Sequence, residues 1–167
     1  GTASPNEATS YIVKHYFQLL SGDNTLSNRY QLSETDTGLS WTTEQVLVLS
    51  SLAKDESLIP WYSYSRARVN WEDVSVIDLT DISIFDETGA IDPDWNLIIN
   101  LFYTRKSYYY TENSVEHASV QRSPSSDSYY YGQNILFTWV ADEGYSFSWF
   151  TINNVDYNTS VLNYENR

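Results

Sequence analysis

Residues 95–110 read WNLIINLFYTRKSYYY and decide the fold of the chain. Large apolar side chains occupy both odd and even positions of this stretch, from Leu97 to Tyr103. Because neighbouring side chains of a strand point to opposite faces, such a strand would bury both faces, which is typical of a central position in a sheet. We therefore predict a long central strand over residues 95–110.

Further strand signals surround this stretch. Large and polar side chains alternate over residues 61–70, and residues 74–85 are rich in β-branched side chains. An acidic turn that ends at Gly144 is typical of a hairpin between strands at 129–140 and 145–155. The C-terminal part of the chain is therefore predicted to hold four or five antiparallel strands.

Two helices are predicted before these strands. Ser4 and Glu7 form a capping box, and apolar side chains then recur every three or four residues. This pattern predicts a helix over residues 5–20. A second, shorter amphipathic helix is predicted from about Thr43 to Asp55.

Helices at one end of the sequence and strands at the other are typical of an α+β fold. We predict a single domain over residues 1–167, with a core over about 5–157 and a polar tail that frays from Tyr157. Its N-terminal helices would pack in a strongly bent, cone-like antiparallel sheet. The members of its one predicted core are Tyr16, Phe17, Leu20, Val46, Leu49, Ile99, Leu101, Phe137 and Phe150.

Four features over about residues 5–157 carry a resemblance to a known family. They are the segment 11–20 (YIVKHYFQLL) before a Ser-Gly-Asp turn, a shorter second helical region, the strand 97–110, and the terminal hairpin 137–150 (FTWVADEGYSFSWF). In these features the chain resembles the nuclear transport factor 2-like (cystatin-like) superfamily. The resemblance implies a cone-shaped fold and frequent dimers. The superfamily includes enzymes, small-ligand binders and structural domains of secretion and conjugation machines, and no site residue is carried over from it.

The composition of the 167 residues excludes several classes of function. Lys and Arg number 9 against 22 Asp and Glu, which gives a net charge of −13. This balance argues against nucleic acids and anionic membrane surfaces as partners, because phosphate binding needs a basic surface. The chain has no Cys, so disulfides and thiolate chemistry are excluded. An aromatic content of 16% indicates a folded protein rather than a disordered one.

The composition also indicates a compartment. The chain lacks Met, has little Lys, and is rich in Tyr, Ser, Thr and Asn. We interpret it as an extracytoplasmic domain of the bacterial cell surface, secreted or membrane-anchored, from which a signal peptide or anchor has been trimmed. No apolar run approaches the roughly 20 residues of a membrane helix, so membrane contact is expected only through an anchor outside this fragment.

The motifs of common enzymes and cofactor sites are missing from the sequence. It contains no Gly-x-Ser-x-Gly elbow, no phosphate-binding loop and no dinucleotide fingerprint. Neither His15 nor His117 has a partner recognisable from sequence. The acidic loop at 92–103 begins like a calcium loop but lacks its Gly and final Glu. Carboxylates along residues 72–81 are interpreted as solvent-facing strand positions, and we expect no cofactor, no metal and no catalysis.

Two Tyr triplets, at 108–110 and 129–131, are the most conspicuous feature. If their strands pair, the rings form an aromatic ladder, with Tyr109 and Tyr130 on one face and the other four rings on the opposite face. The face turned away from the helices would then be a binding surface, unless the triplets are only strand-favouring Tyr. The candidate binding residues are Tyr108, Tyr109, Tyr110, Tyr130 and Trp95.

These observations leave three hypotheses for function. The first is a non-catalytic interaction or assembly domain of a cell-envelope protein, for instance in a secretion or conjugation machine, with a protein partner or a homo-oligomer. The second is a module that binds a small apolar ligand or a sugar, and the third is an enzyme. A closed, dry cavity favours the first, and an open pocket above about 300 Å³ lined by Trp and Tyr favours the second. A cavity with a buried Asp beside Tyr or His favours the third.

Overall fold

The chain divides into two compact units in the computed structural model, unit 1 (Gly1–Lys106) and unit 2 (Ser107–Arg167). The structure describes residues 8–20, 29–42, 46–69, 85–90 and 97–167. The expectation of a single domain over residues 1–167 stays a prediction, which the cooperativity of unfolding would test.

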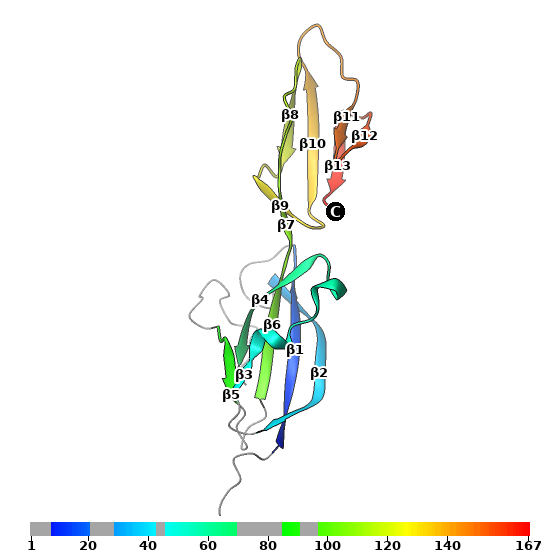
Figure 1. The fold of residues 1–167 in the computed structure, drawn as a ribbon. Coiled ribbons are helices and arrows are strands. Elements are labelled where there is room, and N and C mark those ends of the chain that lie inside the picture. The colour runs from blue at the N-terminus through cyan, green and yellow to red at the C-terminus, as the bar shows by residue number, and fades with distance from the viewer. Residues whose placement is uncertain (1–7, 21–28, 43–45, 70–84, 91–96) are drawn as a thin grey trace, which may run out of the picture. The chain divides into compact units, whose positions relative to one another are not determined.

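The predicted α+β class is wrong, because the described residues form strands almost throughout (Figure 1). Strand β1 (Ala8–Gln18) stands where the first helix was predicted. The spacing of the apolar residues fits both a helix and a strand in this segment. The β-branched and aromatic content of residues 11–17 favours the strand. Strands that pair with β1 on both sides complete its hydrogen bonds and decide the outcome.

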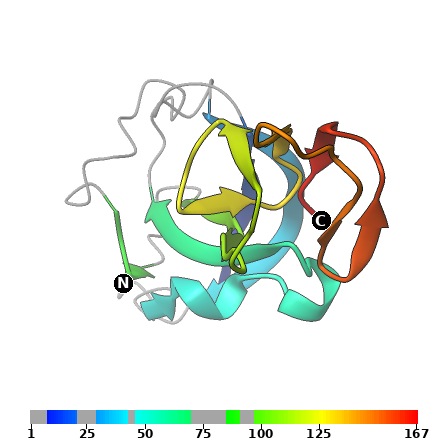
Figure 2. The same ribbon diagram turned by 90° about the horizontal axis from the view of Figure 1, so that it is seen from above.

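The second predicted helix is also wrong. In its place lie a short strand, β3 (Val46–Val48), and two 3-10 turns, η1 (Leu49–Leu52) and η2 (Glu56–Leu58), which are drawn in cyan in Figures 1 and 2. Residues 43–45, where this helix was expected to start, lie outside the described residues. The turns are too short to bury an amphipathic face by themselves, so their apolar side chains depend on the neighbouring sheet.

Unit 1 is built on a four-stranded sheet in the order β2-β1-β6-β4, where β2 is Tyr30–Thr42, β6 is Leu97–Arg105 and β4 is Tyr62–Val69. The predicted central strand is confirmed over the range of β6, which lies between β1 and β4. The sheet is mixed rather than antiparallel, because β6 runs parallel to β1 and antiparallel to β4. Six of the nine side chains of β6 are buried, as a strand covered on both faces requires.

The core of unit 1 lies between this sheet and the segment that carries β3 and η1. Leu49, Ile99, Leu101 and Tyr103 are fully buried there. Strand β3 pairs with β5 (Thr88–Ala90), which brings Gly89 against the core. A Cβ on Gly89 would lie 3.0 Å from a Val69 methyl carbon, so a larger residue at position 89 would push β5 away from β4.

Unit 2 contains three small sheets. The largest has the order β13-β10-β8, where β13 is Val161–Glu165, β10 is Asn134–Ala141 and β8 is Ala118–Ser123. The others pair β7 (Ser107–Tyr109) with β9 (Ser128–Tyr130), and β11 (Phe150–Ile152) with β12 (Val155–Tyr157).

Two expectations for unit 2 are corrected. The turn at Gly144 exists, with a φ of 84°, but the strand after it pairs with β12 rather than returning along β10. The expected fraying tail is instead strand β13, which pairs with β10. Leu162 and Tyr164 alternate inward from β13 and pack against the buried Phe137, which explains why this polar segment is held.

The single predicted core is replaced by separate clusters in the two units. Leu49, Ile99 and Leu101 belong to unit 1, whereas Phe137 belongs to unit 2 and Phe150 is buried beside it. In unit 1 Tyr16 is buried and Phe17 packs at the core margin. Leu20 and Val46 are exposed, because both depended on the helical phase that the chain does not adopt.

Candidate functional site

A concave pocket of about 610 Å³ lies in unit 1, where β1 and β6 end and β4 begins. All four strands of the sheet and the segment after η2 contribute residues to it. Its lining residues are Phe17, Gln18, Leu19, Gln31, Leu32, Ser33, Leu58, Ile59, Pro60, Trp61, Tyr62 and Arg105.

The floor of the pocket is aromatic and is set by the register of the sheet. Phe17 pairs across β1 and β2 with Gln31, and Tyr62 pairs across β4 and β6 with Arg105. The ring of Phe17 meets that of Tyr62 edge to face at 4.9 Å and stacks on Tyr103 at 4.6 Å. These contacts hold the rings in place without a ligand.

The wall of the pocket is the segment from Leu58 to Trp61. Asp55 caps the turn before it, because its carboxylate accepts a hydrogen bond from the Ser57 N–H at 2.9 Å, which lowers the pKa of Asp55. The Trp61 carbonyl accepts a hydrogen bond from the Lys106 N–H at 2.8 Å. Leu58 and Trp61 nevertheless keep 75% and 40% of their surface exposed, so the wall presents apolar area to solvent.

One guanidinium completes the pocket. The Arg105 N–H donates to the side-chain oxygen of Gln18 at 2.9 Å, and Arg105 Nε donates to the Gln18 carbonyl at 3.0 Å. Gln18 is buried, and the guanidinium carbon lies 5.3 Å from the centre of the Tyr62 ring. The orientation of Arg105 is therefore fixed by both hydrogen bonds and ring contact.

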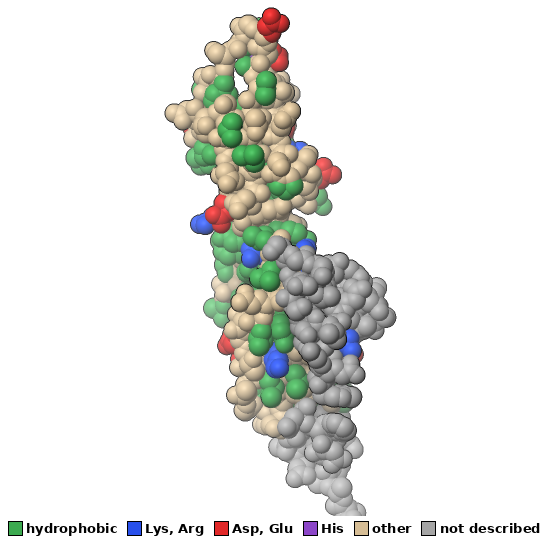
Figure 3. All heavy atoms as spheres, turned by 180° about the vertical axis from the view of Figure 1, so that it is seen from behind, with side chains coloured by type: hydrophobic (Ala, Val, Ile, Leu, Met, Phe, Trp, Pro, Cys, Tyr) green, Lys and Arg blue, Asp and Glu red, His purple; other side chains and the backbone are tan. Residues whose placement is uncertain are grey.

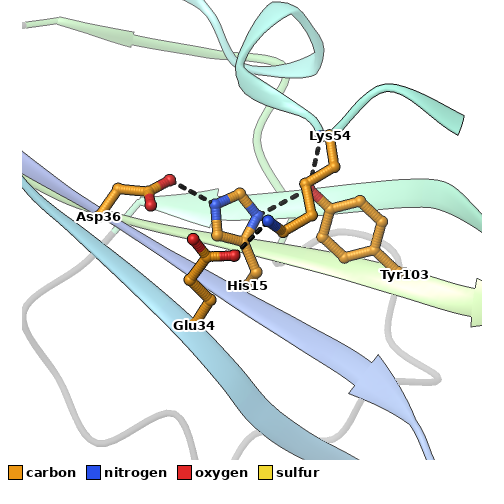
Figure 4. Close-up of polar contacts among 5 residues, drawn as sticks. All are labelled: His15, Glu34, Asp36, Lys54 and Tyr103. Atoms are coloured by element: carbon orange, nitrogen blue, oxygen red, sulfur yellow. Dashed lines mark hydrogen bonds and ion pairs between the residues drawn. The ribbon is translucent and has the colours of Figure 1, made fainter. Parts of the chain in front are cut away.

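A buried polar network lies on the same face of the sheet, further along β1 and β6 (Figure 4). His15 contacts Asp36 through Nε2 and the Tyr103 hydroxyl through Nδ1, both at 2.7 Å. The Lys54 N–H donates to the same hydroxyl at 3.0 Å, while the Lys54 ammonium pairs with Glu34. The network therefore ties β1, β2 and β6 to the segment between η1 and η2.

The Nε2–H tautomer of His15 gives every donor in this network an acceptor. In that tautomer the Lys54 N–H donates to the Tyr103 oxygen, the Tyr103 O–H donates to His15 Nδ1, and His15 Nε2–H donates to Asp36. Burial raises the pKa of Tyr103 to about 12, against the opposing effect of the Lys54 N–H. His15 and Tyr103 are almost completely buried and do not line the pocket. The network accordingly positions the pocket wall rather than reaching a ligand.

A second concavity of about 460 Å³ lies beside the middle of β4. Arg66 stacks over the Phe85 ring there at 4.2 Å, and burial together with the Glu87 charge raises the pKa of Tyr64. Its lining residues are Val48, Ser50, Tyr64, Ser65, Arg66, Phe85, Asp86 and Glu87. The carboxylates at 72–81 that the sequence analysis considered lie outside the described residues.

The predicted binding residues are only partly brought together. The two Tyr triplets pair through β7 and β9 as hypothesised, but only Tyr108 and Tyr129 face each other directly. Tyr109 is 87% exposed and Tyr108 43% exposed, whereas Tyr130 is half-buried. Trp95 lies outside the described residues.

Tyr110 is partly buried and packs against its own unit. Its hydroxyl donates to Glu112 at 2.7 Å, and Arg122 lies 3.6 Å from the centre of its ring. Tyr129 is buried and donates to the Pro124 carbonyl, while Arg122 donates to the Tyr129 oxygen at 2.8 Å. Strands β7 and β9 have only three residues each, so ring contacts rather than strand alternation decide which Tyr is buried.

Some of the pocket residues carry a sequence signal, but that signal does not show that they lie together. Trp61 and Tyr62 appear as aromatic positions of the strand predicted at 61–70, but no local signal connects them with Phe17 or Arg105. The run from Leu58 to Trp61, an apolar cluster around Pro60, was the one available hint of a wall.

Charges and possible metal ligands are dispersed. Within the ranges that the structure describes, no group of three or more His, Asp or Glu side chains is placed to hold a metal ion. On the side of the molecule shown in Figure 3, the described acidic and basic side chains lie singly or in small groups. No helix among the described residues is long and apolar enough to cross a membrane.

Comparison with known proteins found no matching family model, no similar curated protein and no similar solved structure. Membership of the nuclear transport factor 2-like superfamily stays a prediction, and the helices on which its fold would rest are absent from the described residues.

Proposed function

We propose that this chain is a non-catalytic, extracytoplasmic binding domain of a bacterial cell-envelope protein, and that it holds a carbohydrate in the pocket of unit 1. The observation that carries the proposal is the open, preformed pocket floored by Phe17 and Tyr62 and walled by Trp61. Its volume lies within the range of about 300–1,000 Å³ that is usual for small-molecule sites.

The side chains of the pocket suit a sugar better than a purely apolar ligand. Aromatic rings supply flat apolar faces for the C–H side of a pyranose ring. Gln31 and Ser33 add an amide and a hydroxyl group, which can hydrogen-bond the hydroxyls at the rim of such a ring. An apolar ligand would leave these polar groups without partners.

The titratable groups of the described lining support binding more than catalysis. Glycoside hydrolysis needs two carboxyl groups on either side of the scissile bond, and proton transfer in general needs a positioned acid or base. The described lining residues include neither a carboxylate nor an imidazole. The one His with an Asp partner, His15, is buried behind the pocket.

The location remains a proposal that composition supports. A chain without Cys and Met, with abundant Tyr, Ser, Thr and Asn, suits a secreted or anchored envelope domain. In that place a carbohydrate ligand would be a cell-wall or surface glycan.

A second candidate function, assembly with a protein partner or with another copy of the chain, rests on a different observation. Tyr108 and Tyr109 form an exposed aromatic pair on β7, and tyrosine is enriched at protein interfaces. This pair belongs to unit 2, so assembly and sugar binding are separable by mutation.

The test of the first candidate is a glycan array followed by calorimetry with the saccharide that binds best. Trp61→Ala should weaken that binding at least about fivefold, since truncation of an aromatic anchor in a binding site usually costs more than about 1 kcal/mol. The matched control is Trp149→Ala, which removes an equally large and 63% exposed side chain from unit 2. Equal affinity of the Trp61 variant and the wild type would contradict the proposal.

A further inference from the structure

The concavity beside the middle of β4 holds two opposite charges that do not pair with each other. Arg66 and Glu87 both belong to its lining. The antiparallel bridge between Ala67 and Asp86 places Arg66 opposite Glu87, one position further along. Within the part of the chain that the structure describes, the Arg66 guanidinium nevertheless takes part in no ion pair and no hydrogen bond.

The Arg66 guanidinium is held by a ring instead of by a carboxylate. It stacks over Phe85 at 4.2 Å from the ring centre, and Phe85 meets the buried Phe102 of β6 edge to face at 5.8 Å. The Nε atom of Arg66 is buried without a hydrogen-bond partner. Buried polar groups of folded proteins are almost always hydrogen-bonded, so a guanidinium with unused donors at the wall of a cavity indicates a group that binds a ligand. Because the ring fixes its orientation, it loses little rotamer entropy on binding.

Glu87 supplies the opposite charge from a fixed main chain. Its carbonyl accepts a hydrogen bond from the N–H of the fully buried Leu49 at 3.0 Å, while the residue itself is exposed. Burial, and after it the Glu87 charge, raises the pKa of Tyr64, as expected for a carboxylate that lines the same concavity. The carboxylate of Asp86 already accepts a hydrogen bond from the Val69 N–H at 2.8 Å. Of these two carboxylates, Glu87 is therefore the one that a ligand can use.

A ligand with one charge of each sign satisfies both groups. A simple anion would meet Glu87 next to the guanidinium, and a simple cation would meet Arg66. An α-amino acid carries its carboxylate and its ammonium on one carbon atom, and the 55% exposed Val48 adds an apolar part to the lining. The volume of about 460 Å³ lies within the range of small-molecule sites.

We propose that this concavity binds a free α-amino acid with an apolar side chain. Its carboxylate lies on Arg66, its ammonium on Glu87 and its side chain against Val48. The two concavities of unit 1 share no described lining residue, so this inference does not rest on sugar binding.

L-Leucine and two of its fragments are the probes. Isoamylamine is leucine without the carboxylate, and 4-methylpentanoate is leucine without the ammonium. Calorimetry with the wild-type chain should show that leucine binds at least about tenfold more tightly than either fragment, because each fragment lacks one hydrogen-bonded charge contact.

Two variants assign these contacts to their residues. Arg66→Gln should remove the preference for leucine over isoamylamine, and Glu87→Gln should remove the preference for leucine over 4-methylpentanoate. Lys106→Gln and Glu143→Gln make the same changes in net charge outside the described lining and should keep both preferences. Urea midpoints show that each variant is folded.

The wild-type experiment decides the inference even if a variant fails to fold. Equal affinity for the three probes, or no binding of leucine, overturns it. Preferences that survive in both site variants, or that are lost equally in the two controls, also overturn it. Trp61→Ala should leave leucine binding unchanged, and a parallel loss would place leucine in the pocket proposed for the sugar and overturn the inference.

Discussion

The two units bury their small cores in different ways. The four-stranded sheet of unit 1 has strands of eight to thirteen residues, and Leu49, Ile99 and Leu101 are fully buried in the core beside it. Most strands of unit 2 are shorter, and its core of Tyr129, Ile135 and Phe137 is completed by partly buried rings. Long paired strands bury aliphatic side chains completely, whereas short strands depend on amphipathic rings whose polar tips are hydrogen-bonded.

The polar side chains of unit 1 are also more deeply buried than those of unit 2. Unit 1 encloses His15 and Tyr103 in a network that fastens a loop to the sheet. Unit 2 ties Tyr110 and Tyr129 together through the partly exposed Arg122. We therefore expect unit 1 to be more sensitive to the loss of buried groups, and the following predictions test that difference.

The largest effect is expected from Leu101→Ala in unit 1. Removing a fully buried Leu should lower the free energy of unfolding by about 2–5 kcal/mol, and Ile135→Ala in unit 2 should cost about 2 kcal/mol because the smaller core can relax. Urea unfolding measures the cost, and hydrogen exchange shows which unit opens. Leu58→Ala, at a 75% exposed position, is the control and should change stability by less than about 0.5 kcal/mol. A larger cost for Ile135→Ala than for Leu101→Ala would reverse the comparison.

The next effect concerns the hydroxyl of Tyr103. Tyr103→Phe leaves His15 Nδ1 and the Lys54 N–H without their partner, and should cost about 1–3 kcal/mol. Tyr129→Phe removes a hydroxyl of unit 2 that solvent can partly replace, so about 1 kcal/mol is expected. Denaturant midpoints of the two variants provide the measurement, and a neutral Tyr103→Phe would show that the network adds nothing to stability.

Alkaline pH should weaken both units through one Tyr each. Burial raises the pKa of Tyr103 to about 12, and burial with the Glu112 hydrogen bond raises the pKa of Tyr110 to about 12. The folded chain then holds these protons more tightly than the unfolded chain, whose Tyr residues titrate near 10. Their contribution to stability is complete below about pH 10 and is lost as the pH rises to about 12.

Spectrophotometric titration of the phenolate band checks this expectation. Tyr103 and Tyr110 should ionise last, and Tyr103→Phe and Tyr110→Phe should each remove one of these two late steps. Ionisation of all the Tyr residues around pH 10 in the folded chain would contradict it.

The smallest effect on stability is expected from Tyr109→Ser. Tyr109 is 87% exposed on β7, so the change should alter the unfolding free energy by less than about 0.5 kcal/mol. If Tyr108 and Tyr109 form an assembly surface, sedimentation should show weaker association. Tyr145→Ser, at a 54% exposed ring of the same unit, is the matched control. Unaltered sedimentation of the Tyr109 variant would leave the pair as ordinary exposed rings.

The sequence predicts an element well when the element's own residues decide its structure, and poorly when partners distant in the sequence decide it. The stretch 97–105 was predicted correctly as a central strand, because apolar residues on both faces suit few other places. The segment 8–18 was assigned to a helix, since its apolar residues fit both periods and its pairing partners at 30–42 and 97–105 are distant in sequence. Local pattern carries no information about such partners.

The candidate site shows the same limit. Trp61 and Tyr62 belong to the strand predicted over residues 61–70, and Arg105 belongs to the predicted central strand, but their convergence with Phe17 depends on strand register. His15 was interpreted without a partner because Asp36 and Tyr103 reach it from two other strands.

The amino-acid sequence by itself determined the acidic charge, the absence of thiol chemistry, the aromatic richness and the position of the buried strand β6. These properties are sums over residues or belong to one short run, so they need no knowledge of contacts. Only the tertiary structure decided that β1 is a strand, that the core is divided between two units, and that Arg105 joins three aromatic rings in one pocket. Each of these depends on hydrogen bonds and packing between segments far apart in the chain, where the free energy of pairing outweighs local preference.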